Sequence, residues 1–137
     1  MAIIFDEKSK IFLLQGKSST YALCIESDGT IGHRHWGQQI TEICDVSTRT
    51  MLQARNGKID DNQEYRAFGG PSLITPAIKA TLPDGVRAVF LKYKSHTVEG
   101  DTLKIETQDE FYQLTVTLFY RVCEAFNVIE RWTEIKN

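Results

Sequence analysis

The sequence predicts an all-β fold, an antiparallel β-sandwich, from three observations. Turn dipeptides such as Asp28-Gly29 and Asn56-Gly57 separate short runs rich in β-branched and aromatic residues. Residues 114–122 (LTVTLFYRV) alternate, with an apolar side chain at every second position, as expected of a half-buried strand. No segment has a convincing helical spacing of apolar residues. A chain of 137 residues buries roughly two-thirds of its unfolded surface, so we expect one domain, or part of one, over 1–137.

The first predicted elements are a strand at 10–15 and a hairpin of residues 20–27 and 30–36. Asp28-Gly29 suits a two-residue type I′ turn because both central positions need positive φ. Such a turn fixes the register between the two strands. The expected cross-strand pairs are Tyr21 with Trp36, Leu23 with Arg34, Cys24 with His33, and Ile25 with Gly32.

The later elements follow the same reasoning. Residues 40–54 come nearest to helical spacing but are rich in threonine, and residues 55–76 are charged and Gly-rich, which indicates a long loop. Pro83-Asp84-Gly85 predicts a second hairpin that joins 77–82 to 86–94. Further strands are expected at 102–107, 111–122 and 127–135.

Charge, hydropathy and cysteine content exclude several classes of protein. The net charge is −2 without a basic cluster, so the sequence lacks the positive footprint of a nucleic-acid-binding protein. Apolar runs reach about five residues, far short of the roughly 20 that span a bilayer, so no membrane partner is expected. Cys24, Cys44 and Cys123 are widely spaced and form no CxxC motif. This pattern indicates reduced thiols in a cytoplasmic protein.

The residues capable of chemistry form no recognisable catalytic or metal motif. His33 and His35 alternate on a predicted strand opposite Cys24, which would suit zinc or a cupin-like metal site. A cupin pattern needs an acid four or five residues beyond His35, and the first acid is Glu42. We therefore expect no metal and no cofactor. The absence of GxSxG, GxGxxG and P-loop motifs also argues against nucleophilic catalysis and nucleotide binding.

Two groups of carboxylates could in principle support glycoside hydrolysis, which requires a pair. They are Asp60, Asp61 and Glu64 in one segment and Asp109 and Glu110 in another. Both groups lie in polar, turn-like surroundings that would not raise a pKa for acid catalysis. We expect solvated loops and no catalytic residue in this chain.

Aromatic residues supply the only candidate sugar contacts. Trp36 ends a predicted strand, and Tyr65, Arg66 and Phe68 lie in the irregular segment. Aromatic faces contact the C–H groups of sugars, and arginine binds hydroxyls or carboxylates. The alternative for Trp36 is packing in a core or an interface.

Four segments resemble the N-terminal β-sandwich region of bacterial α-galactosidases of glycoside hydrolase family 36. They are the opening 1–26, the IGHRHWGQQI run at 31–40, the EYRAFGG run that starts 64–85, and the LTVTLFYRVCEAFNVIERW stretch at 114–132. The resemblance implies a sandwich of the galactose-mutarotase (supersandwich) type, larger than this chain. It also implies a catalytic (β/α)8 barrel, with both catalytic aspartates, that is absent from 1–137.

The resemblance further implies that the family forms tetramers in which a loop of this domain approaches a neighbouring active site. In many relatives that loop reads G-D-F-R, whereas this chain has Pro71-Ser72-Leu73-Ile74. The leading hypothesis is thus a non-catalytic domain of an α-galactosidase-like hydrolase, used for packing and homo-oligomerisation. The alternatives are a free-standing carbohydrate-binding module and a small metal enzyme that uses His33 and His35.

Overall fold

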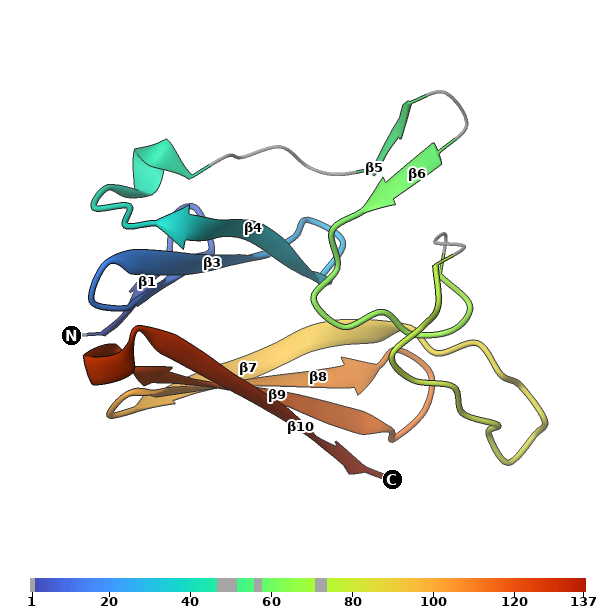
Figure 1. Cartoon of the computed structure of the whole chain (residues 1–137). Coiled ribbons are helices and arrows are strands. Elements are labelled where there is room, and N and C mark those ends of the chain that lie inside the picture. Colours follow the sequence, from blue (N-terminus) through green and yellow to red (C-terminus); the bar gives the residue numbers. More distant parts are fainter. Residues whose placement is uncertain (1, 47–51, 56–57, 71–73) are drawn as a thin grey trace.

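Two four-stranded antiparallel sheets lie face to face in the computed structural model, which describes residues 2–46, 52–55, 58–70 and 74–137 (Figure 1). The N-terminal sheet has the order β1-β2-β3-β4 and the C-terminal sheet the order β10-β9-β8-β7. The N-terminal sheet contains β1 (Ile3–Asp6), β2 (Ile11–Gln15), β3 (Ser19–Ile25) and β4 (Ile31–Gln38). The C-terminal sheet contains β7 (Leu91–Glu99), β8 (Thr102–Asp109), β9 (Thr115–Cys123) and β10 (Val128–Lys136).

Short elements complete the fold. The strands β5 (Leu52–Arg55) and β6 (Lys58–Asp61) form a separate two-stranded antiparallel sheet. Single 3₁₀ turns lie at η1 (Ile43–Asp45) and η2 (Glu124–Phe126). The predicted antiparallel β-sandwich is confirmed.

The main core fills the space between the two sheets. The alternation predicted for 114–122 is confirmed, because β9 buries one side chain in two against the N-terminal sheet. Each sheet contributes one inward face, and Ile78 and Val89 of the connecting segment close one end. The fully buried side chains include Phe12, Leu14, Leu23, Leu103, Ile105, Val116 and Tyr120.

A second, smaller core covers the outer face of the N-terminal sheet. Ile11, Leu13, Ala22 and Cys24 point away from the main core and pack against Val46, with Ile40 and Ile43 beside them. Both faces of β2 are therefore buried, which explains why Ile11–Leu14 is a continuous apolar run rather than an alternating one. The segment after β4 consequently runs over this sheet, and Thr20 Oγ1 accepts a 2.8 Å hydrogen bond from the Ile40 amide.

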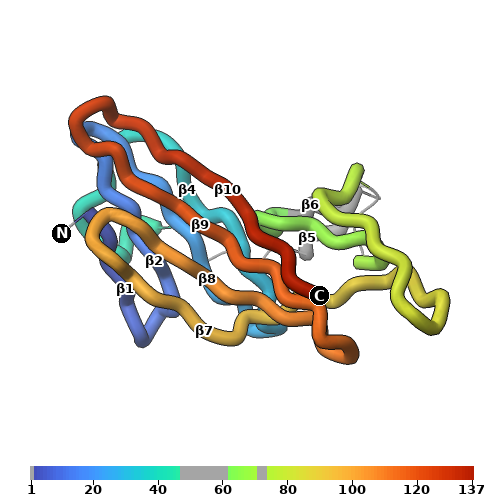
Figure 2. Tube along the Cα trace, turned by 90° about the horizontal axis from the view of Figure 1, so that it is seen from below, coloured from blue at the N-terminus to red at the C-terminus, as the bar shows by residue number. Residues whose placement is uncertain are grey.

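The two sheets are aligned so that β4 and β10 share one side of the sandwich and β1 and β7 the other (Figure 2). The ring of Phe5 on β1 lies 4.4 Å from that of His96 on β7, between centroids. At one end of the sandwich, Asn127 joins the sheets, because its Oδ1 accepts hydrogen bonds from Ser18 N (3.0 Å) and Ser19 Oγ (2.9 Å). Asn127 has a φ of 54°, a left-handed conformation that asparagine tolerates better than most residues.

The register predicted for the first hairpin is wrong near its turn. The loop is longer than two residues, because Glu26 N donates to Thr30 O (2.8 Å) and the Asp28 carboxylate accepts from the Thr30 amide (2.9 Å). The side chain of Asp28 thus organises a wider Asx-type turn. The observed pairs are Leu23 with His33, Cys24 with Gly32, and Ile25 with Ile31.

A β-bulge at Arg34 restores the predicted pairing farther along. Arg34 has no opposite residue on β3, so the register returns to Tyr21 opposite Trp36. The bulge lets the Arg34 guanidinium reach the Glu26 carboxylate at 2.7 Å, and the two side chains are only 4% and 11% exposed. The hairpin is thus confirmed as an element and corrected in its register.

Other boundaries differ from prediction in informative ways. The predicted strands at 10–15, 102–107 and 127–135 are confirmed as β2, β8 and β10, while β1 was not predicted. The strand predicted at 111–122 is confirmed as β9 from Thr115 onward, but 111–114 form a turn instead. The second hairpin is wrong as a pair of strands. Leu82 N donates to Val86 O (2.8 Å), but the segment stays irregular until β7 begins at Leu91. The helix-like 40–54 contains η1 and β5, with 47–51 outside the described residues, and the predicted loop 55–76 includes β6.

Candidate functional site

The open side of the sandwich between β4 and β10 is closed by the short segment 62–65. His33 N donates to Asn62 O (2.7 Å) and Glu64 N donates to Ile31 O (2.8 Å), so this segment pairs with the free edge of β4. The Asn62 amide group donates a further 3.1 Å bond to His33 O. We call this region the seam, defined by β4, β10 and residues 62–65. It anchors the start of the long connection that runs from β6 to β7.

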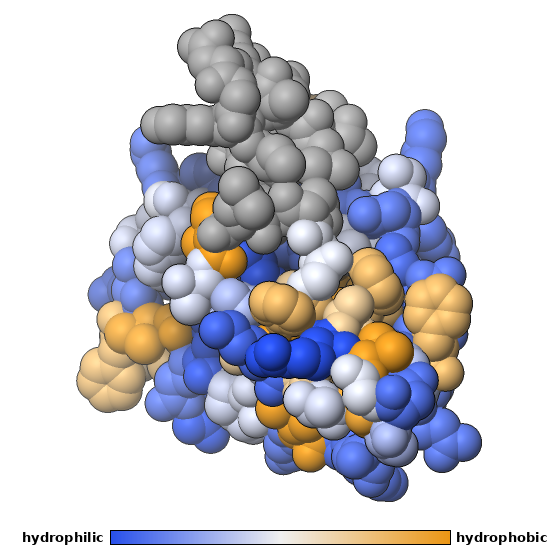
Figure 3. All heavy atoms as spheres, turned by 90° about the vertical axis from the view of Figure 1, so that its right-hand side faces the viewer, coloured by the Kyte–Doolittle hydropathy of each residue, from blue (hydrophilic) through white to orange (hydrophobic). Residues whose placement is uncertain are grey.

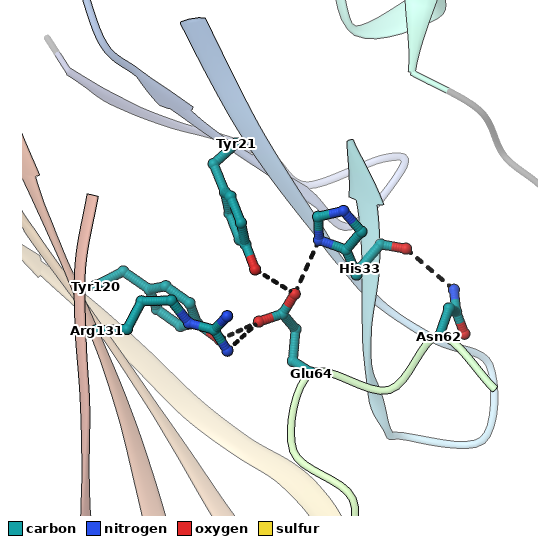
Figure 4. Close-up of polar contacts among 6 residues, drawn as sticks. All are labelled: Tyr21, His33, Asn62, Glu64, Tyr120 and Arg131. Carbon is teal, nitrogen blue, oxygen red and sulfur yellow. Dashed lines mark hydrogen bonds and ion pairs between the residues drawn. The ribbon is translucent and has the colours of Figure 1, made fainter. Parts of the chain in front are cut away.

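Glu64 is the hub of the seam and its side chain is 2% exposed (Figure 4). One carboxylate oxygen accepts from Tyr21 Oη at 2.6 Å and from His33 Nδ1 at 3.0 Å. The other accepts from Tyr120 Oη at 2.9 Å and pairs with the Arg131 guanidinium at 2.7 Å. The donors come from β3, β4, β9 and β10, so a single carboxylate ties both sheets to the 62–65 segment.

The electrostatics of the hub favour an ionised carboxylate. Burial alone would raise the pKa of Glu64, but the hydrogen bonds from His33 and Tyr21 and the charge of Arg131 more than offset it and hold that pKa below its usual value. The pKa of Tyr120 is raised well above its ordinary value by burial and by the nearby carboxylate. The Arg131 guanidinium also lies over the rings of Tyr21 (5.7 Å) and Tyr120 (5.3 Å).

This arrangement is suited to holding structure rather than to proton transfer. A general acid needs a raised pKa and access to substrate, whereas Glu64 has a lowered pKa and four donors around two oxygens. The expectation that Glu64 lies in a solvated loop is therefore wrong. Its four partners are spread along the sequence between residues 21 and 131, so the polar residues next to Glu64 in sequence could not indicate them. The one available signal was its place at the head of the family-like EYRAFGG run.

The expectation of a solvated carboxylate is also wrong for Asp109, which is 5% exposed. Its carboxylate accepts hydrogen bonds from the amides of Phe90 (2.7 Å), Phe111 (2.8 Å) and Tyr112 (2.9 Å). Asp109 therefore fixes the turn after β8 against the segment before β7. Like Glu64, it is held by several donors, here three backbone amides.

The metal geometry considered for Cys24, His33 and His35 does not form. The corrected register places Cys24 opposite Gly32, and the bulge turns His33 toward Glu64 while His35 Nε2 lies 3.0 Å from Gln38 O. Within residues 2–46, 52–55, 58–70 and 74–137, no cluster of three or more His, Cys, Asp or Glu side chains could hold a metal ion.

The four predicted sugar-contact residues lie in different settings. Trp36 is at the seam, 53% exposed, with its ring 5.4 Å from that of Tyr21. Tyr65 is half-buried, hydrogen-bonds Thr133 of β10, and lines a cavity of about 10 Å³, room for about one water molecule. Arg66 is half-buried, and its carbonyl accepts from Ala77 N (2.8 Å). Phe68 is 40% exposed under the Arg87 guanidinium.

Figure 3 shows the end of the sandwich from which the long connection projects, where apolar groups lie among hydrophilic ones. Phe90 of the long connection and Phe111 of the β8–β9 turn contact each other, with ring centroids 6.1 Å apart edge-to-face, and Phe111 is 70% exposed. We call this pair the loop-end patch. Phe68, Ile74 and Val86 of the long connection are exposed as well.

None of the described helices is long and apolar enough to span a membrane.

Comparison with known proteins identifies the class. The chain belongs to glycosyl hydrolase family 36, because the profile of the "Glycosyl hydrolase family 36 N-terminal domain" matches residues 29–137. Alpha-galactosidase AgaA of Geobacillus stearothermophilus is 25% identical over 167 residues, an alignment that covers 100% of this chain and 23% of that protein. Alpha-galactosidase Mel36A of Lactobacillus acidophilus is 26% identical, with 98% and 23% covered.

A solved structure agrees with the sequence comparison. The α-galactosidase AgaB of Geobacillus stearothermophilus superposes with a TM-score of 0.83 at 25% identity, over 100% of this chain and 22% of that one. The chain therefore corresponds to the N-terminal domain of these α-galactosidases and spans less than a quarter of their length. The predicted family resemblance is confirmed.

Proposed function

We propose that this chain serves as the non-catalytic N-terminal domain of an α-galactosidase-type hydrolase that acts on terminal α-galactosides. The domain would support packing and homo-oligomerisation, with a tetramer as the expected assembly, and would shape a neighbouring subunit's active site. The observation that carries the proposal is the Glu64 hub, which holds the start of the long connection against both sheets. A loop held in this way can present a defined surface to another domain or subunit.

Two further observations support this role. Retaining and inverting glycosidases need two carboxyl groups, one with a raised pKa. The two buried carboxylates described above are instead engaged in structural contacts, Glu64 with four donor groups and Asp109 with three backbone amides. The loop-end patch also exposes two contacting aromatic rings, and Phe68, Ile74 and Val86 are exposed on the same long connection; exposed apolar groups of this kind are common at protein interfaces.

The loop that the family resemblance places near a neighbouring active site has a different sequence in this chain. Pro71-Ser72-Leu73 lies outside the described residues, and Ile74 is 53% exposed. Neither an aspartate nor an arginine stands at 71–74, so a contribution of this segment to a neighbouring site would come from apolar side chains and the Ser72 hydroxyl rather than from charged groups. All three cysteines are free thiols, which fits a cytoplasmic location in this proposal.

The test combines sedimentation of the purified chain with hydrolysis of p-nitrophenyl α-galactoside in the same sample. We expect concentration-dependent self-association and no turnover. Phe111→Lys, which places a charge in the loop-end patch, should shift the chain toward monomer. Phe126→Lys is the matched control, because Phe126 is 82% exposed in η2, outside the patch.

Each outcome decides one part of the proposal. A monomer at all concentrations would rule out the assembly role. Turnover that follows the protein peak would rule out the non-catalytic role. Equal effects of Phe111→Lys and Phe126→Lys would show that the loop-end patch is not the contact surface.

A free-standing carbohydrate-binding module is the second candidate, favoured by the exposure of Trp36. Because Trp36, Tyr65 and Phe68 occupy different settings, such a module would depend on Trp36 alone among the predicted contacts. Retained galactoside binding in Trp36→Ala would exclude this form of the alternative.

A further inference from the structure

The outer face of the C-terminal sheet carries an aromatic row that the main core does not use. Lys104 on β8, Phe119 on β9 and Trp132 on β10 stand directly opposite one another in register. All three point away from the core, because their strand neighbours Leu103, Ile105, Leu118 and Tyr120 are buried inward. Trp132 nevertheless stays 40% exposed. The row is therefore a surface feature rather than part of a second core.

The rings of this row are held in one orientation. Phe119 and Trp132 are parallel within 5°, with centroids 5.0 Å apart, which is an offset stack. The Lys104 ammonium lies 6.0 Å from the Phe119 centroid, and the Arg121 guanidinium lies 5.8 Å from that of Trp132. A ring that is fixed in the free protein loses little conformational entropy when a ligand stacks on it.

Part of the Trp132 side chain is open to solvent, because the residue is 40% exposed. The contacts that Trp132 makes with Phe119 and Arg121 both come from β9. The solvent-exposed part of the indole is the surface on which a flat apolar ligand can stack.

Polar groups flank the ring at fixed positions. Arg121 and Glu130 are opposite one another in the next cross-strand row, and Arg121 Nε donates to Glu130 Oε2 at 2.6 Å. Both side chains are about half exposed, at 53% and 43%. The pair thus offers N–H donors and a carboxylate acceptor beside the indole, the two functions that sugar hydroxyls require.

We propose that Trp132, stacked on Phe119 and flanked by Arg121 and Glu130, forms a surface binding platform for galactosides on the outer face of the C-terminal sheet, opposite the face that carries the Glu64 hub. The axial O4 of galactose leaves C3–H, C4–H and C5–H together on one apolar face, which matches an exposed indole. In glucose O4 is equatorial, so C4–H no longer lies on the same face as C3–H and C5–H. The proposal rests on the galactoside specificity of the proposed function and assigns it a second, non-catalytic contact that would retain oligosaccharides near the protein.

The two tryptophans of the chain make the test specific. Trp36→Phe leaves Trp132 as the sole indole, and Trp132→Phe leaves Trp36. Titration with methyl α-galactoside should change the emission of the Trp36→Phe variant saturably and leave that of the Trp132→Phe variant unchanged. Methyl α-glucoside should bind the Trp36→Phe variant at least tenfold more weakly. Saturation-transfer NMR should give its strongest signals at H3, H4 and H5 of the galactoside.

Further variants separate binding from folding. Glu130→Gln keeps the shape of the polar pair, and we expect weaker binding with an unchanged circular dichroism spectrum. The proposal fails if the Trp36→Phe variant shows no saturable change, or if galactoside and glucoside bind equally. It also fails if Trp132→Phe alters only the sedimentation of the chain, which would make the row a protein interface. None of these readouts depends on turnover or on Phe111, so failure here is distinguishable from failure of the proposed function.

Discussion

Replacing Glu64 by glutamine tests whether the hub holds the sandwich together. The substitution keeps the shape of the side chain and removes its charge. The amide can still accept from Tyr21 and His33, but its NH₂ group faces Tyr120 and Arg131, which are donors in the native protein. A Tyr120 hydroxyl can rotate to accept, whereas the Arg131 guanidinium cannot.

The size of the effect follows from burial. Breaking a buried ion pair costs about 3–5 kcal/mol, and a hydrogen bond to a charged group contributes about 1.5–3 kcal/mol. Arg131 is 46% exposed and can recover water when its partner is lost, so the lower end of that range applies. We expect Glu64→Gln to lower the free energy of unfolding by roughly 3 kcal/mol, which corresponds to a fall in Tm of about 10 °C for a domain of this size.

Urea unfolding followed by circular dichroism and tryptophan emission measures this loss. The matched control is Glu106→Gln, which removes the charge from the surface pair of Glu106 with Lys94, whose side chains are 26% and 52% exposed. The control should cost less than about 1 kcal/mol. Equal losses in the two variants would refute the reasoning, because the hub would then be no stronger than a surface pair.

Three further predictions concern pH, packing and the sheet-joining turn. The folded-state pKa of Glu64 lies below its unfolded value of about 4.5. The stability that ionised Glu64 gives to the fold should therefore be complete above pH 4.5 and should fall as the pH drops through the folded-state pKa. Glu64→Gln should flatten this part of the plot of unfolding free energy against pH, and an unchanged slope would contradict the linkage. Gly32→Ala should lower the free energy of unfolding by about 1–3 kcal/mol, because an added Cβ would overlap Glu26 Oε1, which is held by Arg34. Gly37→Ala on the same strand is the control, since its Cβ would meet its nearest atom at 3.5 Å. Thermal melts that rank the two variants alike would count against this reasoning. Asn127→Ala should lower the free energy of unfolding by about 1–2 kcal/mol, because it loses both Oδ1 hydrogen bonds and the tolerance for positive φ. In urea unfolding, the stability of Asn127→Gly should lie between that of Asn127→Ala and that of the native protein. A glycine variant no more stable than the alanine variant would show that the backbone conformation contributes nothing.

The strand pattern was predictable from sequence because it depends on local alternation and on turn residues. Residues 114–122 alternate strictly, and β9 buries the predicted face. β1 escaped prediction because it is only four residues long. The predicted hairpin at Pro83 reduces to a turn because residues 86–90 extend toward Phe68 and Asp109 instead of pairing with 77–82, with Val89 N donating to Phe68 O.

The hub could not be predicted, because its chemistry depends on contacts between residues far apart in the chain. Glu64 has charged neighbours in sequence, which favoured a solvated position, whereas its structural neighbours are two tyrosines, a histidine and an arginine. The register near Asp28 failed for a similar reason. The bulge at Arg34 depends on the buried partner Glu26, and no local pattern marks it.

The separation of the hub partners along the chain has a consequence for the kinetics of the molecule. Each sheet is a meander whose neighbouring strands are consecutive in sequence, so its hairpins close short loops and form early. Tyr21 and Glu64 are 43 residues apart, Tyr120 and Glu64 are 56 apart, and Ser18 and Asn127 are 109 apart. We expect these long-range contacts to form after the local hairpins and to be largely missing from the rate-limiting step of folding. Loss of the hub should therefore accelerate unfolding and leave the folding rate nearly unchanged, which makes Glu64 a determinant of how long the native sandwich persists.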